Sequence, residues 1–514
     1  MNADILIKNA TCLTMKDGVT WDWIAIHNKT ILALGKTGEE NNLVNENTIV
    51  IDAGGNTVLP GFIDSHFHVV QTALNAKSMD LSKVRSFEDI GMQIQKVVSE
   101  RPGNCITGIG LQMEQLKEMK FPDRLELDRY CSDVPVWINC LDYQVSMLNT
   151  YGLLYYKVPF NMEGVEKDNQ DVATGIFRGK ANAVLRMNIL DGITDKARKE
   201  AVSDIIPGLL ATGITTVNAM EGGYMYSDKD ADFILEYGSE FPVDMAIFYQ
   251  SLDLEKMKNK HLKRIGGSLY VDGTMGARTA ALSFEYADSP GRMGSLRYTQ
   301  NELNEFVTAC YMNNLQLSLY TIGDRAIGSA LHAHEYALYQ TGIRGLRHRL
   351  EHVELATLEH INKARELGVI FSMNPTYETY WGGSEKMYAQ RLGQNYVRTN
   401  MFRSIIDGGV CLIGGSDSDI TDYNPMVGIS AAVNHPVEKH RISIYEALEM
   451  YTSKAAYGIF EEEKKGTLES GKLADVIILN QNILSTPQEM LDQVKVVATI
   501  KSGDLIYNAL NQEC

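Results

Sequence analysis

Two histidines near the N-terminus have the type and spacing of metal ligands. His66 and His68 follow the apolar run 58–63. On a β-strand, residues i and i+2 point to the same side, so both imidazoles can reach one point. Two neutral imidazoles that converge in this way suit a divalent metal. The same spacing is also common among ordinary surface and core histidines, so the interpretation depends on matching residues further along the chain.

Two later segments supply such residues. His352 lies near the end of the strand-like run 347–353, and Asp417 follows the run 410–415. In a parallel barrel the reactive groups gather at the C-terminal ends of the strands. His66, His68, His352 and Asp417 therefore form a candidate divalent-metal site. Asp417 could also accept a proton from a water that the metal activates.

The elements that must position these residues are strands that alternate with helices. Helix-like segments such as 301–313 and 327–340 fill the gaps between eight short runs that could be barrel strands. Repeated strand–helix units predict a parallel sheet, and eight of them predict an α/β fold built on a distorted (β/α)₈ TIM barrel. The eight runs are 58–64, 214–220, 243–249, 268–272, 315–321, 347–353, 369–374 and 410–415.

The two ends of the chain have a different pattern. Short alternating runs with Gly, Asn and Asp between them occupy residues 1–57 and 466–514, which we predict to form one composite β-sandwich. The barrel is then expected over 58–465. The segment from about 75 to 200 is too long for one crossover and contains strand-like runs at 105–111 and 134–140. We interpret it as an insertion over the barrel mouth.

Composition excludes several kinds of partner. The 514 residues carry a formal net charge of −17, which disfavours nucleic acid and anionic membranes. The seven cysteines are scattered and contain no C-x-x-C motif, as expected for free thiols in a reducing compartment. Neither a signal peptide nor a stretch long enough to span a bilayer is recognisable. We therefore predict a cytoplasmic protein that acts on a small molecule.

Motifs along most of the chain resemble the amidohydrolase superfamily, and within it the amidohydrolase 3 group that includes N-substituted formamide deformylases. The matching segments are Leu59-Pro60-Gly61-Phe62-Ile63-Asp64-Ser65-His66-Phe67-His68, Asp272-Gly273-Thr274-Met275-Gly276-Ala277-Arg278-Thr279-Ala280, Ile322-Gly323-Asp324-Arg325-Ala326-Ile327, Arg349-Leu350-Glu351-His352, Gly415-Ser416-Asp417 and Gly466-Thr467-Leu468-Glu469-Ser470-Gly471-Lys472-Leu473-Ala474-Asp475. The resemblance implies a distorted barrel with a sandwich from both termini. It also implies a metal-dependent hydrolase, usually of C–N bonds.

The resemblance further implies roles for single residues. It assigns His66, His68 and Asp417 to one metal, usually zinc, with Mn²⁺ or Fe²⁺ as alternatives. His352 would bind a second metal or contact the substrate, and Asp417 would also take the proton from the attacking water. Because members of the family often dimerise, the resemblance leaves a homodimer open.

The chain departs from the family pattern at two usual ligand positions. Ser268 stands where relatives carry a lysine whose carbamate bridges two metals, and Tyr320 stands where they carry a histidine. A serine cannot form a carbamate, and a tyrosine with a pKa near ~10 is a poor zinc ligand. A third departure lies in the insertion, where a histidine is replaced within Asp142-Tyr143-Gln144. These changes predict one metal rather than two.

Other residues are candidates for substrate contact. Glu221, at the end of the second barrel run, could bind substrate, cap a helix or supply a fourth metal ligand. Gln144 is a candidate in the insertion. Asp272 and Arg278 fit substrate recognition as well as an ion pair that braces a loop.

Three functions remain open at this stage. The first is a single-metal hydrolase of a small amide, formamide or cyclic amide, in which His352 steadies the developing oxyanion and Tyr320 donates an additional hydrogen bond. The second is a lyase or isomerase that uses the same metal site for proton transfer beside a carbonyl. The third is a non-catalytic binding or regulatory protein whose second metal site has decayed.

Overall fold

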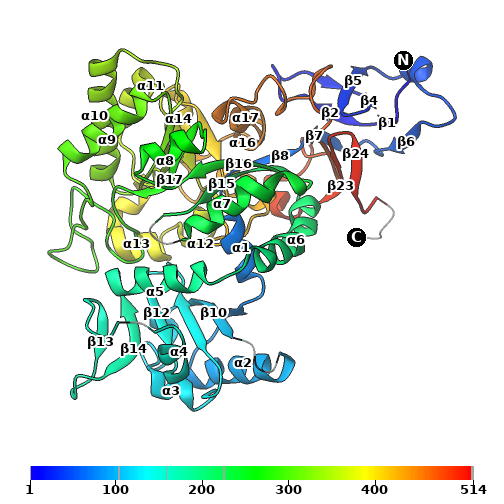
Figure 1. Cartoon of the computed structure of the whole chain (residues 1–514). Coiled ribbons are helices and arrows are strands. Elements are labelled where there is room, and N and C mark those ends of the chain that lie inside the picture. The colour runs from blue at the N-terminus through cyan, green and yellow to red at the C-terminus, as the bar shows by residue number, and fades with distance from the viewer. Residues whose placement is uncertain (1, 102, 104, 158, 224–225, 511–514) are drawn as a thin grey trace. The chain divides into compact units, whose positions relative to one another are not determined.

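The computed structural model describes residues 2–101, 103, 105–157, 159–223 and 226–510, with the side chains of Asn41 and Ser268 left out of the description. The chain divides into two compact units. The first unit, residues 1–68, 206–220 and 234–514, contains a barrel and a sandwich. The second, residues 69–205 and 221–233, has its own sheet (Figure 1).

Eight parallel strands form a nearly closed barrel, which confirms the predicted fold class. Neighbours in the barrel follow the order of the sequence, and each predicted run overlaps one barrel strand. The ring closes beyond the last strand, where the Asp417 amide donates to the His66 carbonyl at 2.9 Å. The strands are β8 (Phe62–Phe67), β15 (Ile214–Glu221), β16 (Asp244–Tyr249), β17 (Arg264–Tyr270), β18 (Gln316–Thr321), β19 (Arg349–His352), β20 (Ile370–Met373) and β21 (Leu412–Gly414).

Helices lie around the barrel strands, as Figure 1 shows for α9 and α10. The predicted helices 301–313 and 327–340 correspond to α9 (Gln300–Met312) and α10 (Asp324–Thr341). A capping box of Thr299 and Glu302 begins α9, and Gly342 ends α10 with a left-handed φ of 67°. The other helices between barrel strands or after them include α8 (Leu254–Asn259), α11 (Leu358–Leu367), α12 (Thr376–Trp381), α13 (Met387–Leu392), α14 (Phe402–Asp407), α15 (Pro425–Val433), α16 (Ile444–Met450) and α17 (Ser453–Gly458).

Both termini build the sandwich. One sheet has the order β5-β4-β1-β6 and the other β24-β23-β22-β7-β2-β3. Side chains from both sheets, such as Ile7 and Ile478, share one apolar core. The strands are β1 (Ile5–Lys8), β2 (Thr11–Leu13), β3 (Thr20–Trp21), β4 (Trp23–His27), β5 (Thr30–Gly35), β6 (Ile49–Asp52), β7 (Thr57–Pro60), β22 (Val476–Leu479), β23 (Val496–Lys501) and β24 (Asp504–Asn508).

The predicted first barrel run, 58–64, was wrong as a single strand. It is divided at Gly61 into β7, which pairs with β22 in the sandwich, and β8, which pairs with β15 in the barrel. The chain passes close to β15 at the division, because a Cβ on Gly61 would lie 2.4 Å from the Thr215 side chain. Only a glycine allows this approach without displacing its neighbour. The fourth barrel strand also begins earlier than predicted, at Arg264.

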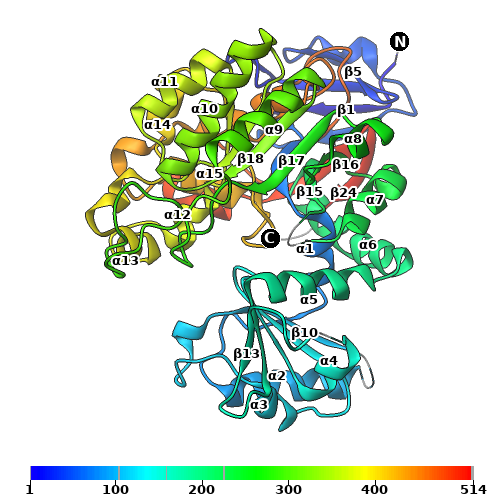
Figure 2. The same ribbon diagram turned by 60° about the vertical axis from the view of Figure 1, so that its left-hand side comes forward.

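The second unit folds around one six-stranded sheet of order β13-β14-β12-β11-β10-β9 (Figure 2). Its predicted runs correspond to β10 (Ile106–Leu111) and β11 (Val136–Cys140). Successive residues such as Trp137 and Ile138 belong to different apolar clusters, as alternation along a strand requires when both faces are covered. The remaining elements include β9 (Met79–Asp80), β12 (Val145–Leu148), β13 (Val165–Lys167), β14 (Ala173–Arg178), α1 (Val69–Asn75), α2 (Phe87–Glu100), α3 (Arg124–Asp128), α4 (Thr150–Tyr155) and α5 (Gly179–Asp191).

Two further helices, α6 (Asp195–Ala211) and α7 (Asp228–Tyr237), contribute residues to both units. Throughout the described ranges, the helices all lack the combination of length and apolar character that a membrane crossing requires. The placement of the insertion over the barrel mouth stays a prediction.

Candidate metal centre

Three predicted ligands come together at the ends of the first and last barrel strands. His66 lies in β8, His68 follows it, and Asp417 follows β21. Oδ1 of Asp417 lies 3.2 Å from Nε2 of His66 and 3.2 Å from Nε2 of His68. All three side chains are buried, and their ligand atoms lie within 4.8 Å of one another. Among the residues described, no other three His, Cys, Asp or Glu side chains meet this condition.

The opposite nitrogen of each imidazole fixes its tautomer. Nδ1 of His68 lies 2.7 Å from the Met220 carbonyl, which can only accept a hydrogen bond. Nδ1 of His66 lies 2.8 Å from Oε2 of Glu351. Both Nδ1 atoms are therefore donors, so Nε2 is the atom of each ring that faces the carboxylate of Asp417 and that can offer a metal its lone pair once it carries no proton. Nε2 of His66 is buried and makes no hydrogen bond of normal geometry, as expected for an atom that binds a metal.

Glu351 is the buried anion behind His66. Its carboxylate pairs with Arg349 through Nε–Oε1 at 2.8 Å and Nη2–Oε2 at 3.1 Å, and it accepts the Ser318 hydroxyl. Burial alone would raise its pKa, but Arg349 and His66 lower the pKa of Glu351 to about 2. The carboxylate is therefore ionised at neutral pH and can hold the His66 N–H in place.

Asp417 has a strained backbone, and two buried residues position it: Asp64 through the neighbouring Ser416, and Tyr377 directly. Its φ of 56° lies in the left-handed region, where non-glycine residues are uncommon. Asp64 accepts the backbone N–H groups of His66 and Ser416 at 3.0 Å each, which joins the two ligand segments. The Tyr377 hydroxyl donates to Oδ2 of Asp417, so Oδ1 is the oxygen that faces the imidazoles.

Charge interactions decide the protonation of the ligands in the metal-free site. Burial would raise the pKa of Asp417, but the positive charge of His66 and the close approach of both imidazoles hold that pKa well below its usual range. Burial would likewise lower the pKa of His66, but Asp417 and Glu351 raise it to about 9. The site therefore holds a proton on His66 at neutral pH, and a metal must displace this proton to bind.

His352 lies beside this group but is not part of it. Its ring centroid lies 4.9 Å from that of His66, and the cluster of ligand atoms within 4.8 Å leaves it out. Nδ1 of His352 lies 2.7 Å from Oδ1 of Asn374, whose amide nitrogen donates to the Gly415 carbonyl. The Asn374 orientation makes Nδ1 of His352 the donor and Nε2 the acceptor. Burial lowers the pKa of His352 to about 4, and its role as a ligand stays a prediction.

Tyr320 is buried against the same ring. Its ring centroid lies 4.5 Å from that of His352, and its hydroxyl donates a long hydrogen bond of 3.5 Å to the Gly273 carbonyl. Burial and the neighbouring acidic groups raise the pKa of Tyr320 well above its usual value. The residue is therefore a neutral hydroxyl rather than a phenolate, and its hydrogen bond to the substrate stays a prediction. The Ser268 side chain lies outside the described residues.

The predicted substrate-contact residues in the barrel brace loops. Both carboxylate oxygens of Asp272 accept backbone N–H groups, from Ala281 at 2.9 Å, Ile322 at 3.1 Å and Gly323 at 2.8 Å. Arg278 forms a two-point ion pair with Asp288, at 3.0 and 2.8 Å. Asp272 and Arg278 thus each have a structural partner of their own.

Glu221 and Gln144 also have local partners in the second unit. Glu221 accepts the Val70 N–H at 3.2 Å, which caps the start of α1, and burial raises its pKa well above the usual range. Gln144 donates to the backbone oxygen of Asp142 at 3.3 Å in the turn between β11 and β12. Their predicted contacts with substrate stay predictions.

Sequence reasoning gave no role to Glu351, Arg349 or Asn374. A signal for the first two was present, because Arg349 and Glu351 have the i, i+2 spacing of residues on one side of a strand. No comparable signal marked Asn374 or Tyr377, which reach the site from the segment after β20.

Comparisons with known proteins match most of the chain. The amidohydrolase family model matches residues 49–507. The chain is 26% identical to Protein LONG AFTER FAR-RED 3 of Arabidopsis thaliana, with 98% of this chain and 92% of that protein covered. It is 23% identical to an N-substituted formamide deformylase of Arthrobacter pascens, with 98% of each covered.

A solved structure has the same architecture. It is that of an uncharacterized metal-dependent hydrolase from Pyrococcus furiosus, with a TM-score of 0.76 and 27% sequence identity. The alignment covers 93% of this chain and 99% of that one.

Proposed function

The chain belongs to the amidohydrolase family, and we propose that it uses one divalent metal, zinc, to hydrolyse a C–N bond of a small amide, formamide or cyclic amide. One observation carries the proposal. Nε2 of His66, Nε2 of His68 and Oδ1 of Asp417 converge in a buried site, and the opposite nitrogens of both rings are engaged by Glu351 and Met220. Three protein ligands with an open position are typical of catalytic metal sites.

The donor set fits one metal better than two. Two imidazoles and a carboxylate suit zinc, and the same set also suits Fe²⁺. Ser268 cannot supply a bridging carbamate, and burial favours the neutral form of Tyr320. These two residues therefore argue against a second metal.

The side chains around the three ligands suit hydrolysis. When bound, the metal supplies a Lewis acid and a water that is nucleophilic near neutral pH. Asp417 is ionised and can accept a proton from an attacking water. Tyr320 retains its proton and can exchange its long hydrogen bond to the Gly273 carbonyl for one to an oxyanion that develops on the substrate.

His352 cannot make the oxyanion contact expected from the sequence, but it can act as a metal ligand or a proton acceptor. The Nδ1 contact with Asn374 leaves a lone pair on Nε2, and burial keeps the ring neutral. A lone pair can bind a metal or accept a proton, but it cannot donate to an oxyanion. We therefore assign oxyanion stabilisation to Tyr320.

The first experiment is a measurement of metal content by plasma mass spectrometry, on protein purified without chelators or a metal-affinity column. A His66→Ala/His68→Ala double variant is the control. We expect about one equivalent of zinc, absent from the control. Two equivalents would contradict the single-metal proposal, and no metal after incubation with Zn²⁺, Mn²⁺ or Fe²⁺ would contradict the proposed function.

A second experiment identifies the reaction class. N-formyl and N-acyl amides are screened with the metal-loaded protein in water enriched in ¹⁸O. Hydrolysis incorporates one labelled oxygen into the carboxylic acid product, whereas a lyase or isomerase forms a product without it. Turnover without the label would therefore contradict hydrolysis.

A further inference from the structure

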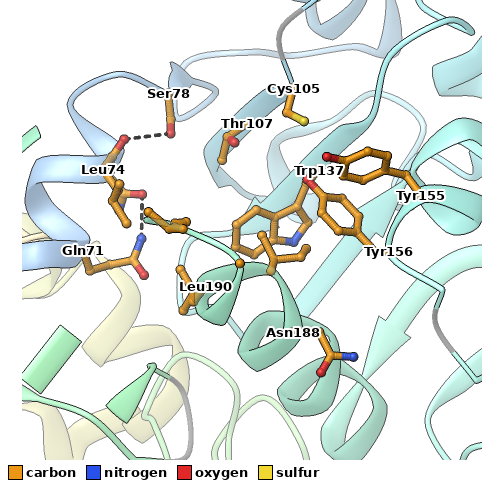
Figure 3. Close-up of a pocket in the computed structure, with 14 residues that line it drawn as sticks. Gln71, Leu74, Ser78, Cys105, Thr107, Trp137, Tyr155, Tyr156, Asn188 and Leu190 are labelled. Carbon is orange, nitrogen blue, oxygen red and sulfur yellow. Dashed lines mark hydrogen bonds between the residues drawn. The ribbon is translucent and has the colours of Figure 1, made fainter. Parts of the chain in front are cut away.

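The second unit contains a cavity that the proposed function does not use. Its volume is about 530 Å³, within the range of small-molecule binding sites. Figure 3 shows its walls, which come from α1, β10, β11, α4 and α5 and from the residues that flank them. None of the three candidate metal ligands lines it.

One side of the cavity is aromatic. The rings of Trp137, Tyr155 and Tyr156 line it close together in Figure 3. The indole N–H of Trp137 donates to the Ser146 hydroxyl at 3.2 Å, so the polar edge of this ring is already satisfied within the protein. Tyr155 and Tyr156 meet edge to face, with ring centroids 5.0 Å apart. This side therefore presents flat apolar surfaces, against which an aromatic ring can pack.

The side formed by α1 carries neutral amides in fixed positions. Nε2 of Gln71 donates to Oδ1 of Asn75 at 2.8 Å, and the amide nitrogen of Asn75 donates to the Tyr143 hydroxyl at 2.6 Å. Arg186, which is fully buried, donates to Oε1 of Gln71 at 3.2 Å. Because these amides are already ordered, a ligand that hydrogen-bonds to them loses little conformational entropy on the protein side.

The charge of the lining limits the ligand further. The residues that line the cavity include no Lys, Arg, His, Asp or Glu. A charged ligand would give up its hydration there without direct contact with an opposite charge, because Arg186 is not among the lining residues. We propose that this cavity binds a small, uncharged aromatic molecule with a hydrogen-bonding group, such as an aromatic amide.

Cys105 provides a reporter for this site. Its side chain lines the cavity and is exposed, whereas the other described cysteines are buried or half-buried. In a Cys514→Ser background, which removes the cysteine outside the described residues, the rate of Cys105 alkylation by N-ethylmaleimide is measured by peptide mapping. Benzamide, benzoate and benzylammonium are the probes, because they share a ring and differ in charge.

We expect benzamide to slow the alkylation of Cys105 at a concentration roughly tenfold lower than either charged probe. Equal protection by all three probes, or tightest protection by benzoate or benzylammonium, would overturn the uncharged class of ligand. No protection by benzamide up to its solubility limit would overturn the site.

A cavity-filling variant locates the binding. Thr107→Phe adds a ring from β10 into the cavity and should weaken protection by benzamide at least tenfold. Thr174→Phe, on β14 and outside the lining, is the matched control and should leave protection unchanged. If Thr107→Phe fails to fold, Asn188→Trp fills the cavity from an exposed position on α5. If benzamide still protects Cys105 in a variant that folds and has its cavity filled, the proposal would be overturned.

The metal content of each variant is measured in parallel. We expect it to equal that of the parent protein, because none of these substitutions touches His66, His68 or Asp417. If the protein binds benzamide but takes up no metal even after incubation with Zn²⁺, Mn²⁺ or Fe²⁺, the result would support the cavity and contradict the proposed function. The two proposals can therefore fail separately.

Discussion

The hydroxyl of Tyr377 donates to Oδ2 of Asp417, while Oδ1 of the same carboxylate lies 3.2 Å from Nε2 of His66. The tyrosine thus determines which carboxylate oxygen faces the metal site. Its ring also lies parallel to that of His352, with centroids 6.0 Å apart. Tyr377 is therefore a positioning residue that connects α12 to the ligand after the last barrel strand.

Replacement of this tyrosine should weaken the metal site without removing a ligand. In Tyr377→Phe, Oδ2 of Asp417 loses its donor, and we expect zinc affinity to fall about 10-fold to 100-fold, as for other residues that orient metal ligands. Competition with a chromogenic chelator measures the change. Tyr380→Phe, on the same helix at an exposed position, is the control and should bind zinc like the parent protein. Equal affinity in the two variants would contradict the positioning role.

The buried anion behind His66 should matter both for metal binding and for stability. Glu351→Gln removes the charge that pairs with Arg349 and orients His66. We expect zinc affinity to fall about 10-fold to 100-fold. Because Arg349 is left as a buried charge without its partner, the free energy of unfolding should fall by about 3–5 kcal/mol. Chelator competition and urea unfolding measure the two effects.

An equivalent ion pair nearer the surface is the control for this change. Arg347 and Glu462 form a pair at 2.6 Å, with side chains 18% and 31% exposed. Glu462→Gln should therefore cost at most about 1 kcal/mol and leave zinc binding unchanged. A similar loss of stability in the two variants would show that burial does not govern the Glu351 pair.

Zinc binding should depend on pH through His66. The pKa of this histidine is raised to about 9 in the metal-free protein, so zinc displaces a proton when it binds at neutral pH. The apparent affinity should rise by about tenfold per pH unit up to pH 9 and level off above it. Isothermal titration in buffers of different ionisation enthalpy counts the released protons. Binding at pH 7 without proton release would contradict this assignment.

Adding one methyl group at Gly61, where the chain passes from the sandwich to the barrel, should destabilise the protein. A Cβ on Gly61 would lie 2.4 Å from Thr215, so Gly61→Ala should destabilise the protein by about 1–3 kcal/mol. Gly276→Ala is the matched control, because a Cβ there meets no atom within 4 Å and the residue has no left-handed φ. Thermal unfolding compares them, and equal midpoints would contradict the close approach of β7–β8 to β15.

The barrel strands could be predicted because local sequence patterns mark them, whereas contacts between distant residues could not. Most of the predicted barrel runs are short and apolar, as a buried parallel strand is, and each run overlapped a barrel strand. The break at Gly61 escaped prediction, since residues 58–63 read as one apolar run and only the partner strands divide them. The structural partners of Asp272 and Arg278 were likewise hidden, because backbone amides and distant acids leave no local pattern.

The sequence by itself determined which residues could hold a metal and the barrel that carries them. The i, i+2 spacing of His66 and His68 and the position of Asp417 after a strand are local properties of the chain. Only the tertiary structure decided how these ligands are oriented and protonated. Glu351 meets His66 across 285 positions, and Tyr377 meets Asp417 across 40. Tautomer, protonation and carboxylate orientation depend on such contacts, which form only when the barrel closes.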